Sequence, residues 1–312
     1  MPTNATIGSR RRRLAAACVL WAVSGLNAVT AQPAHHDEPH PQAAAALQHV
    51  QVADPASGRV YELLLSQPDK PAPAAGYAVV YLFDGNRSAP KALAWLRAHD
   101  LADRVLVVGV GYPDTADFDV ARRYQDLTPT AAPDHPGSGQ AGAFLDFIET
   151  QVKPRIARRY RIDPARAALF GHSLGGLTVL YALTRNPARY SAYFAASPSL
   201  WWHEGDLIAP LRQRARRDDC GAGQRRDVVI TVGREEQPLD QTPTDPPERR
   251  AKLARRRMVD NAATAADILG GCAAFDIDYQ ILPGADHGAA LPAGLYHALA
   301  HWMDKDSAAP MP

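Results

Sequence analysis

The stretch RAALFGHSLGGLTVLYAL at 166–183 constrains the fold more than any other part of the sequence. An apolar run with strand character ends at Gly171, and a run with helical character begins at Leu174, so only His172 and Ser173 separate them. A chain passes from strand to helix in so few residues only where the elements approach closely, which the flanking glycines permit. The pattern G-x-S-x-G in this context predicts a strained turn with the Ser173 hydroxyl exposed at a strand end.

Apolar runs bounded by glycine and proline alternate with segments of helical spacing through the rest of the chain. Strands are expected at 77–85 and 104–112, both buried and parallel, at 166–173, 190–197, 226–233 and 275–284, and as an antiparallel edge strand at 59–67. Helices are expected at 143–160, with a kink at Pro154, and at 174–185, 247–269 and 291–303. This alternation predicts an α/β fold in a single domain, with one mostly parallel sheet flanked by helices.

The amino-terminal segment has the pattern of an export signal. Four arginines at 10–13 precede an apolar run at 14–29, and small residues mark a cleavage site after Ala31. We expect a signal peptide at 1–31, with Sec and twin-arginine export both open, and a periplasmic protein. A disordered leader is expected at 32–48, the catalytic domain at 49–305, and a disordered tail at 306–312.

The net charge argues against two classes of partner. The formal charge is +1, and cleavage removes four arginines and no acids, which leaves +1 − 4 = −3. A mildly acidic protein is poorly suited to nucleic acid or to a polybasic membrane role, and no membrane span is expected after cleavage. Cys220 and Cys272 remain in the mature chain, either as a disulfide or as two separate thiols.

Ser173 is the predicted nucleophile, and the competing interpretation is a glycine-rich turn with a capping serine. Because the helix begins at Leu174, its backbone N–H points toward the same position and is one expected oxyanion donor. The second donor is expected from the loop after the strand at 77–85, as the N–H of Gly85 or of Asn86. The sequence does not choose between these two.

A general base should follow the serine in the chain, because this type of turn orders its triad as Ser, acid, His. The candidates are His203, His287, His297 and His301. His287 is preferred because it lies in LPGADHG, just past the carboxyl end of the last strand, where the sheet brings strand ends together. The pair at 297 and 301 has the spacing of a metal half-site, but an exposed helix face is favoured and no metal is expected.

The acid should lie just after the strand at 226–233. Glu236 is preferred over Glu235, which would point to the opposite side of an extended segment. Asp240 would suit a longer loop, and a Ser-His dyad without any acid is the remaining alternative.

Several stretches together resemble a known family. They are YLFDGN, GVGYP, RRYQDLTP, FIETQVKPRIARRYRID, LFGHSLGGL, SPSLWW and PGADHG, in this order from about residue 50 to 303. The chain resembles the esterase branch of the α/β-hydrolases, and within it the periplasmic esterases of trilactone siderophores such as enterobactin and salmochelin. The resemblance implies an α/β-hydrolase fold and ester hydrolysis through Ser173 and His287, without a cofactor. Some members are described as lacking a third acid.

The resemblance implies a small-molecule ester as substrate, such as a ferric catecholate siderophore, whose iron would belong to the substrate. Arginine and tryptophan side chains suit anionic aryl ligands, and the candidates near strand ends are Arg87, Arg122, Arg123, Trp201 and Trp202. The competing interpretation is that one arginine pairs with Asp126 and one tryptophan lies in the core. Alternative functions are a carboxylesterase for feruloyl or acetyl esters, and an acyltransferase.

Overall fold

The computed structural model describes residues 47–115, 117–217, 220, 224–237 and 246–308, with the backbone alone at 306–308. The predicted signal peptide, the leader up to residue 46, the candidate acid Asp240 and the last residues of the predicted tail lie outside the described residues.

An eight-stranded sheet with the order β1-β2-β4-β3-β5-β6-β7-β8 forms the centre of the described residues. β1 pairs antiparallel with β2, β2 pairs antiparallel with β4, and the other strands are parallel. The strands are β1 Leu47–Ala53, β2 Val60–Ser66, β3 Tyr77–Phe83, β4 Val105–Gly111, β5 Ile162–His172, β6 Ala192–Ala196, β7 Arg226–Gly233 and β8 Phe275–Leu282. Every residue of β3 and β4 is buried, as their continuous apolar runs predict.

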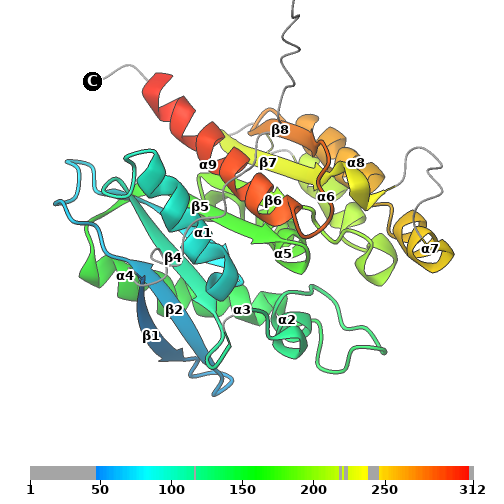
Figure 1. Ribbon diagram of the computed structural model, residues 1–312, viewed down its shortest axis with the longest axis horizontal. Helices are drawn as coiled ribbons and strands as arrows, with labels where there is room; N and C mark the ends of the chain where they lie inside the picture. The colour runs from blue at the N-terminus through cyan, green and yellow to red at the C-terminus, as the bar shows by residue number, and fades with distance from the viewer. Residues whose placement is uncertain (1–46, 116, 218–219, 221–223, 238–245, 309–312) are drawn as a thin grey trace, which may run out of the picture. The chain divides into compact units, whose positions relative to one another are not determined.

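Helices cover both faces of this sheet. They are α1 Gly85–Ala98, α2 Val120–Asp126, α3 Ala141–Phe147, α4 Lys153–Arg159, α5 Leu174–Arg185, α6 Ile208–Ala215, α7 Pro247–Arg256, α8 Met258–Gly270 and α9 Ala290–Ala308. Figure 1 shows α1 (cyan) and α9 (red) in front of the sheet, where Leu93 and Leu295 pack with Phe170 of β5. On the other face, α5 and α8 pack through Leu180 and Leu269. The predicted fold class is confirmed.

The boundaries differ from the prediction at the edge of the sheet and at both ends of the domain. The strand predicted at the edge is β2, but β1 lies outside it and includes residues 47 and 48, which the sequence predicts as part of the leader. β1 contains three polar residues, Gln48, His49 and Gln51, and the segment before it is also polar. For this reason the sequence does not predict a strand there. At the other end, α9 continues through 306–308, which were assigned to the tail.

Two predicted helices are interrupted. The segment expected at 143–160 consists of α3, a π-helical turn at Ile148–Val152, and α4. Pro154 directly follows this π turn within a continuous helical backbone, where it has no N–H for an intrahelical bond, so the irregularity of the helix coincides with the predicted kink. The helix expected at 247–269 divides into α7 and α8 at Arg257, whose φ is 48°.

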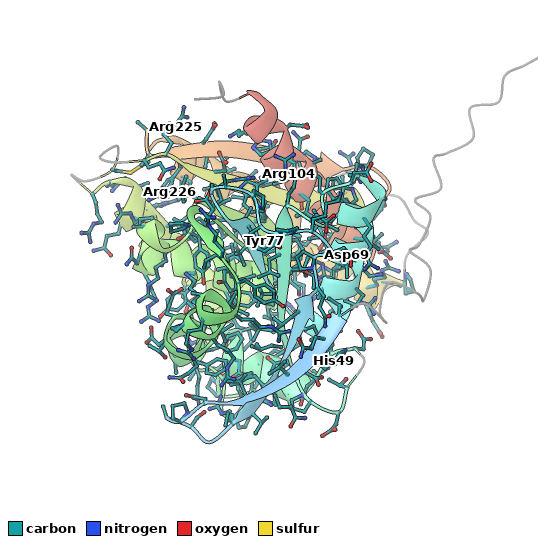
Figure 2. The ribbon with its side chains drawn as sticks, turned by 90° about the vertical axis from the view of Figure 1, so that its left-hand side faces the viewer. His49, Asp69, Tyr77, Arg104, Arg225 and Arg226 are labelled. Atoms are coloured by element: carbon teal, nitrogen blue, oxygen red, sulfur yellow. A yellow bond between two sulfur atoms is a disulfide. The ribbon has the colours of Figure 1, made fainter. Side chains whose placement is uncertain are left out.

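Polar contacts tie the amino ends of the strands to nearby loops. The Tyr77 hydroxyl at the start of β3 donates to the Lys70 carbonyl at 2.6 Å, and the Asp69 N–H donates to Asp103 at 2.8 Å. Figure 2 labels Tyr77 and Asp69, together with Arg226 at the start of β7. Because β3 to β8 are parallel, these contacts lie at the opposite end of the sheet from Ser173.

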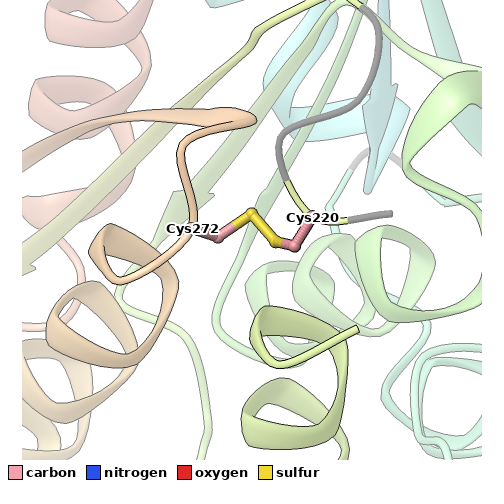
Figure 3. Close-up of a disulfide and its surroundings, with 2 residues drawn as sticks. All are labelled: Cys220 and Cys272. Carbon is pink, nitrogen blue, oxygen red and sulfur yellow. A yellow bond between two sulfur atoms is a disulfide. The ribbon is translucent and has the colours of Figure 1, made fainter. Parts of the chain in front are cut away.

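A disulfide joins Cys220 to Cys272, with their Cα atoms 5.6 Å apart (Figure 3). Cys220 follows α6 in the chain, and Cys272 follows α8 and is buried. The bond therefore links the segments that precede β7 and β8, and it resolves the alternatives that the sequence left open in favour of a disulfide.

Candidate active site

A sharp turn between β5 and α5 holds Ser173. Its φ of 62° and ψ of −117° lie outside the favoured regions for a residue with a side chain. A Cβ atom on Gly171 would collide with the Gly175 carbonyl group, and one on Gly176 would lie 2.8 Å from the Ala196 carbonyl oxygen. Gly171 therefore lets β5 and α5 pass in contact, Gly176 lets α5 approach the end of β6, and the structure has the strand–turn–helix geometry that the sequence predicts.

Three side chains from separate loops form one hydrogen-bonded chain. His287, in the loop between β8 and α9, has Nε2 at 3.0 Å from the Ser173 hydroxyl oxygen. Its Nδ1 lies 2.6 Å from a carboxylate oxygen of Glu236, in the turn after β7. If Nδ1–H donates to this carboxylate, Nε2 is left as an acceptor for the Ser173 O–H. The order of contacts is that of a nucleophile, a base and an orienting acid.

Glu236 is the acid that the described residues bring to His287. Its other carboxylate oxygen accepts the Gly233 N–H at 2.8 Å and a hydrogen bond from the Ser197 hydroxyl. Its side chain is buried, whereas Glu235 is exposed. The segment after β7 is a 3₁₀ turn at Arg234–Glu236 and not the extended segment assumed from the sequence, although the same glutamate faces inward.

The two helices that begin beside Ser173 place backbone N–H groups at this site. Leu174 is the first residue of α5, and Gly85 and Asn86 are the first residues of α1, so none of their N–H groups has an intrahelical acceptor. The two helix starts are close, because a Cβ atom on Gly175 would lie 3.6 Å from the Asp84 carboxylate. The choice between Gly85 and Asn86 as second donor stays open.

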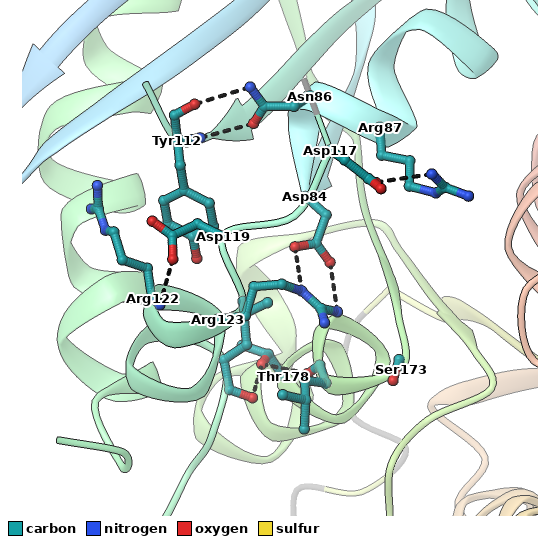
Figure 4. Close-up of polar contacts among 12 residues, drawn as sticks. Asp84, Asn86, Arg87, Tyr112, Asp117, Asp119, Arg122, Arg123, Ser173 and Thr178 are labelled. Atoms are coloured by element: carbon teal, nitrogen blue, oxygen red, sulfur yellow. Dashed lines mark hydrogen bonds and ion pairs between the residues drawn. The ribbon is translucent and has the colours of Figure 1, made fainter. Parts of the chain in front are cut away.

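The Asn86 side chain fixes this loop (Figure 4). Its amide nitrogen donates to the carbonyls of Tyr112 at 3.0 Å and Thr115 at 2.7 Å, and its oxygen accepts the Tyr112 N–H at 2.8 Å. The backbone before it bends sharply, because Asp84 has a φ of 50°. Thus Asn86 holds the start of α1 against the loop that follows β4.

A cavity of about 150 Å³ opens at Ser173. Its lining residues are Arg87, Phe118, Arg123, His172, Ser173, His287, Gly288 and Leu291. The two guanidinium groups lie over the Phe118 ring, 5.2 Å from its centroid for Arg87 and 4.4 Å for Arg123. The cavity therefore combines two cations with one aromatic surface beside the reactive hydroxyl.

The two arginines of this cavity are held differently (Figure 4). Arg123 makes two bonds to the buried Asp84 carboxylate, at 2.7 and 3.0 Å, whereas Arg87 pairs with the exposed Asp117 at 2.9 Å. Burial acts to lower the pKa of Arg123, but the Asp84 charge more than offsets this and raises it. Arg123 is therefore a cation held in place by a buried carboxylate. Arg87 pairs with an exposed carboxylate and is held less firmly.

The other predicted substrate residues lie elsewhere. Arg122 donates to the Val60 carbonyl at 2.7 Å and lies 3.8 Å from Asp126. Trp202 is in the core, with its ring nitrogen donating to the Thr130 carbonyl at 3.1 Å. The Arg256 guanidinium lies over the Trp201 ring at 4.3 Å. These three residues do not line the cavity, because neighbouring positions on a short helix or turn face different directions.

The remaining candidate histidines also have separate partners. His203 is exposed and lies 3.6 Å from Asp206. His297 and His301 both contact Asp278, at 2.5 and 3.3 Å. No group of histidine, cysteine and acidic residues suited to a metal ion occurs among the residues that the structure describes.

Two residues near the nucleophile were not identified from the sequence. The Ser199 hydroxyl lies 3.2 Å from that of Ser173, and its N–H donates to the Ser173 carbonyl at 3.0 Å. His172 packs against His287, with ring centroids 4.6 Å apart. Ser199 lies in SPSLWW and His172 lies in GHSLGG, so both belong to stretches that carry the family resemblance. The sequence alone gives neither residue a role of its own.

Comparison with known proteins gives consistent matches. The family described as "Putative esterase" matches residues 55–291. The siderophore triacetylfusarinine C esterase of Aspergillus fumigatus is 31% identical over 266 residues, which cover 79% of this chain and 90% of that protein. The ferri-bacillibactin esterase of Bacillus subtilis is 37% identical over 165 residues, 48% of this chain and 57% of that protein.

Solved structures support the same fold. A siderophore hydrolase of Aspergillus nidulans matches with a TM-score of 0.73 and 27% identity, over 86% of this chain and 97% of that one. The BES protein of Bacillus cereus matches with a TM-score of 0.70 and 28% identity, over 83% of this chain and 95% of that one. These matches confirm the α/β-hydrolase fold.

Proposed function

The chain belongs to the esterase family that matches residues 55–291, and on that premise we propose that it is a serine esterase acting on siderophores. The observation that carries the proposal is the chain of contacts from Ser173 through His287 to Glu236 beside a cavity. The family makes the protein a carboxylic ester hydrolase, and the geometry supports the identity of the reacting groups.

In the first half of the proposed reaction, the Ser173 oxygen attacks the ester carbonyl while His287 Nε2 takes the hydroxyl proton. The Glu236 carboxylate stabilises the resulting imidazolium through Nδ1. The oxyanion accepts the N–H of Leu174 and one N–H from Gly85 or Asn86. Collapse breaks the bond to the alcohol, which takes the proton from His287 and leaves an acyl group on Ser173.

In the second half, His287 takes a proton from water, and the hydroxide attacks the acyl group. The carbonyl–Ser173 bond then breaks, His287 returns the proton to the serine oxygen, and the carboxylic acid leaves. The His287 side chain is 41% exposed, which gives water direct access to its ring. This exposure is compatible with the hydrolytic step.

The cavity supports an oxygen-rich anionic substrate such as a catecholate siderophore. Arg87 and Arg123 supply positive charge, and Phe118 supplies an aromatic face. Pockets that enclose a drug-sized ligand are typically about 300–1,000 Å³, so a cavity of about 150 Å³ accommodates one ester arm. The remainder of the siderophore would lie outside the cavity.

The test compares ferric enterobactin with p-nitrophenyl butyrate as substrates of the purified protein. We expect a higher kcat/KM on the siderophore, mass spectra that show ring-opened and shortened products, and loss of both activities in Ser173→Ala. Preference for the butyrate ester would assign the enzyme to simple carboxylic esters. A product that incorporates an added alcohol instead of water would indicate an acyltransferase.

We also propose export to the periplasm by the segment at 1–31. The disulfide supports an oxidising compartment. Among the described residues, no helix has the length and apolar character needed to cross a membrane. Detection of a mature chain that begins at Gln32 in a periplasmic extract would test the proposal, and an uncleaved chain in the cytoplasm would contradict it.

A further inference from the structure

The loop after β6 brings two buried hydroxyl groups to the catalytic residues. The Ser197 hydroxyl donates to Glu236, and the Ser199 hydroxyl oxygen lies 3.2 Å from that of Ser173. Ser197 and Ser199 are buried, with 0% and 1% of their surface exposed. The mechanism above gives the Ser199 hydroxyl no role, although this group contacts the oxygen that attacks the ester.

Backbone hydrogen bonds hold this loop without help from the Ser199 hydroxyl. The Ser199 N–H donates to the Ser173 carbonyl at 3.0 Å, and the Ser173 N–H donates to the Ala196 carbonyl at 3.0 Å. The Trp202 N–H donates to the Ser199 carbonyl, also at 3.0 Å. None of these bonds uses a side chain, so a substitution that removes the Ser199 hydroxyl leaves all of them in place.

The hydrogens of the triad fix the direction of the contact between the two serines. Because His287 Nδ1 donates to the Glu236 carboxylate, Nε2 is an acceptor. The single hydroxyl hydrogen of Ser173 donates to this nitrogen, over an oxygen–nitrogen distance of 3.0 Å. The hydrogen between the two serine oxygens is therefore that of Ser199, which makes Ser199 the donor and Ser173 the acceptor.

This contact should be stronger during the reaction than in the resting enzyme. Its length of 3.2 Å exceeds the usual distance of about 2.5–3.0 Å between hydrogen-bonded hydroxyl oxygens. As His287 takes the proton, the Ser173 oxygen gains negative charge, and hydrogen bonds to charged oxygens are shorter and stronger. An interaction that strengthens in the transition state lowers the barrier to reaction.

The same contact limits how the Ser173 side chain can turn. A serine side chain has three staggered rotamers, and its oxygen carries one hydrogen and two lone pairs. With the hydrogen bonded to His287 and one lone pair bonded to Ser199, the second lone pair is left for the substrate carbonyl. We propose that Ser199 is a positioning residue, which holds the Ser173 oxygen and stabilises the charge that forms on it. This inference rests on the esterase function proposed above.

Two pairs of proteins test the proposal, and the members of each pair differ by one hydroxyl. The native enzyme is compared with Ser199→Ala, and Ser199→Thr is compared with Ser199→Val, which has the same shape. The control is Ser191→Ala at the amino end of β6, whose hydroxyl donates to the Ala167 carbonyl at 3.0 Å.

Three rates are measured for each protein. They are kcat/KM for ferric enterobactin, kcat/KM for p-nitrophenyl butyrate, and the rate of inactivation by phenylmethylsulfonyl fluoride. In the inactivation the Ser173 oxygen bonds to sulfur and fluoride leaves, so all three rates depend on attack by the same oxygen. The three reagents differ greatly in size, so they place different demands on the cavity.

We expect all three rates to fall about tenfold in Ser199→Ala. Ser199→Thr should be faster than Ser199→Val by a similar factor, and Ser191→Ala should keep the native rates. A role confined to the structure of the cavity would slow the large siderophore more than the small inhibitor. An equal loss in the three reactions therefore indicates an effect on the Ser173 oxygen itself.

A member with the hydroxyl that is no faster than its partner, in either folded pair, would overturn the proposal. The Ser199→Thr and Ser199→Val pair covers the case in which Ser199→Ala does not fold. A loss confined to ferric enterobactin would also overturn it, because that pattern indicates a defect in binding. Hydrolysis of p-nitrophenyl butyrate by Ser173→Ala at the native rate is a different result, because it would overturn the esterase mechanism and the role of Ser199 with it.

Discussion

The two ends of the central sheet are built differently. At the carboxyl ends of β3, β5 and β6, the next residues are Asp84, Ser173 and Ser197, with φ values of 50°, 62° and 44°. Such left-handed backbone is unfavourable for residues with a side chain. At the amino ends, side chains make ordinary contacts with the main chain, as Tyr77 does with Lys70.

This difference separates activity from stability. The strained residues hold the nucleophile, the Arg123 partner and the hydroxyl that bonds Glu236, so the strain lies where groups must be fixed for chemistry. The amino ends and the nearby disulfide hold the elements together without contacting the cavity. Substitutions at the carboxyl ends should therefore change activity most, and those at the amino ends should change stability most.

The largest expected effect is that of Ser173→Ala. Loss of the nucleophile should lower kcat by about 10⁴- to 10⁶-fold, with little change in melting temperature. The matched control is Ser191→Ala at the amino end of β6, whose hydroxyl donates to the Ala167 carbonyl at 3.0 Å. That variant should lose about 1 kcal/mol of stability and keep its activity. A Ser173→Ala variant that keeps more than about a hundredth of kcat would contradict the mechanism.

Glu236→Gln should have the next largest effect. The amide keeps the size of the side chain but removes the charge that orients His287, so kcat should fall about 10²- to 10⁴-fold. Glu235→Gln is the matched control, because it makes the same change one residue earlier on an exposed side chain. Steady-state measurements of kcat for both variants test which glutamate orients His287. Equal activity in the two would indicate a Ser-His dyad, and a larger loss in Glu235→Gln would reverse the assignment.

The glutamates show where prediction from the sequence stops. Ser173 and His287 could be placed because each follows a clear strand, and parallel strand ends meet at one edge. The acid depends on the turn after β7, which in turn depends on the close approach of Gly233 to the Ala285 carbonyl. The alternation of an extended segment selects Glu236, but that approach joins residues far apart in the sequence, so no local pattern predicts the 3₁₀ turn that places it.

The arginines give a second example. Arg122 and Arg123 are adjacent on α2, but one faces β2 and the other faces the cavity. Successive residues on a helix point about 100° apart, and α2 has only seven residues with no clear apolar face. The sequence therefore predicts a basic pair near the site without showing which member reaches it.

Removal of the disulfide tests the other half of the comparison. A Cys220→Ser and Cys272→Ser double variant frees a loop with a sequence separation of 52. The chain-entropy model then predicts a loss of about 4 kcal/mol in the free energy of unfolding. Activity per folded molecule should be retained, because neither cysteine lines the cavity. Urea denaturation and kinetics on the same samples measure both quantities. Loss of activity at unchanged stability would contradict the separation of the two ends.

The smallest expected effect concerns His172, a carboxyl-end residue whose burial should also affect stability. In the unfolded chain a histidine has a pKa near 6.5, whereas burial lowers the pKa of His172 in the folded protein. Below pH 6.5 the unfolded state therefore binds a proton that the folded state does not, and the free energy of unfolding falls as pH falls. From pH 7.0 to 5.5 this loss is about 1 kcal/mol.

His172→Gln lacks this contribution, while His287 and the other histidines remain in both proteins. Urea denaturation at the two pH values should show a smaller loss in the variant. An equal loss in both would mean that the folded protein accepts the proton at His172, and that this part of the carboxyl end is more open to water than its 5% exposure indicates.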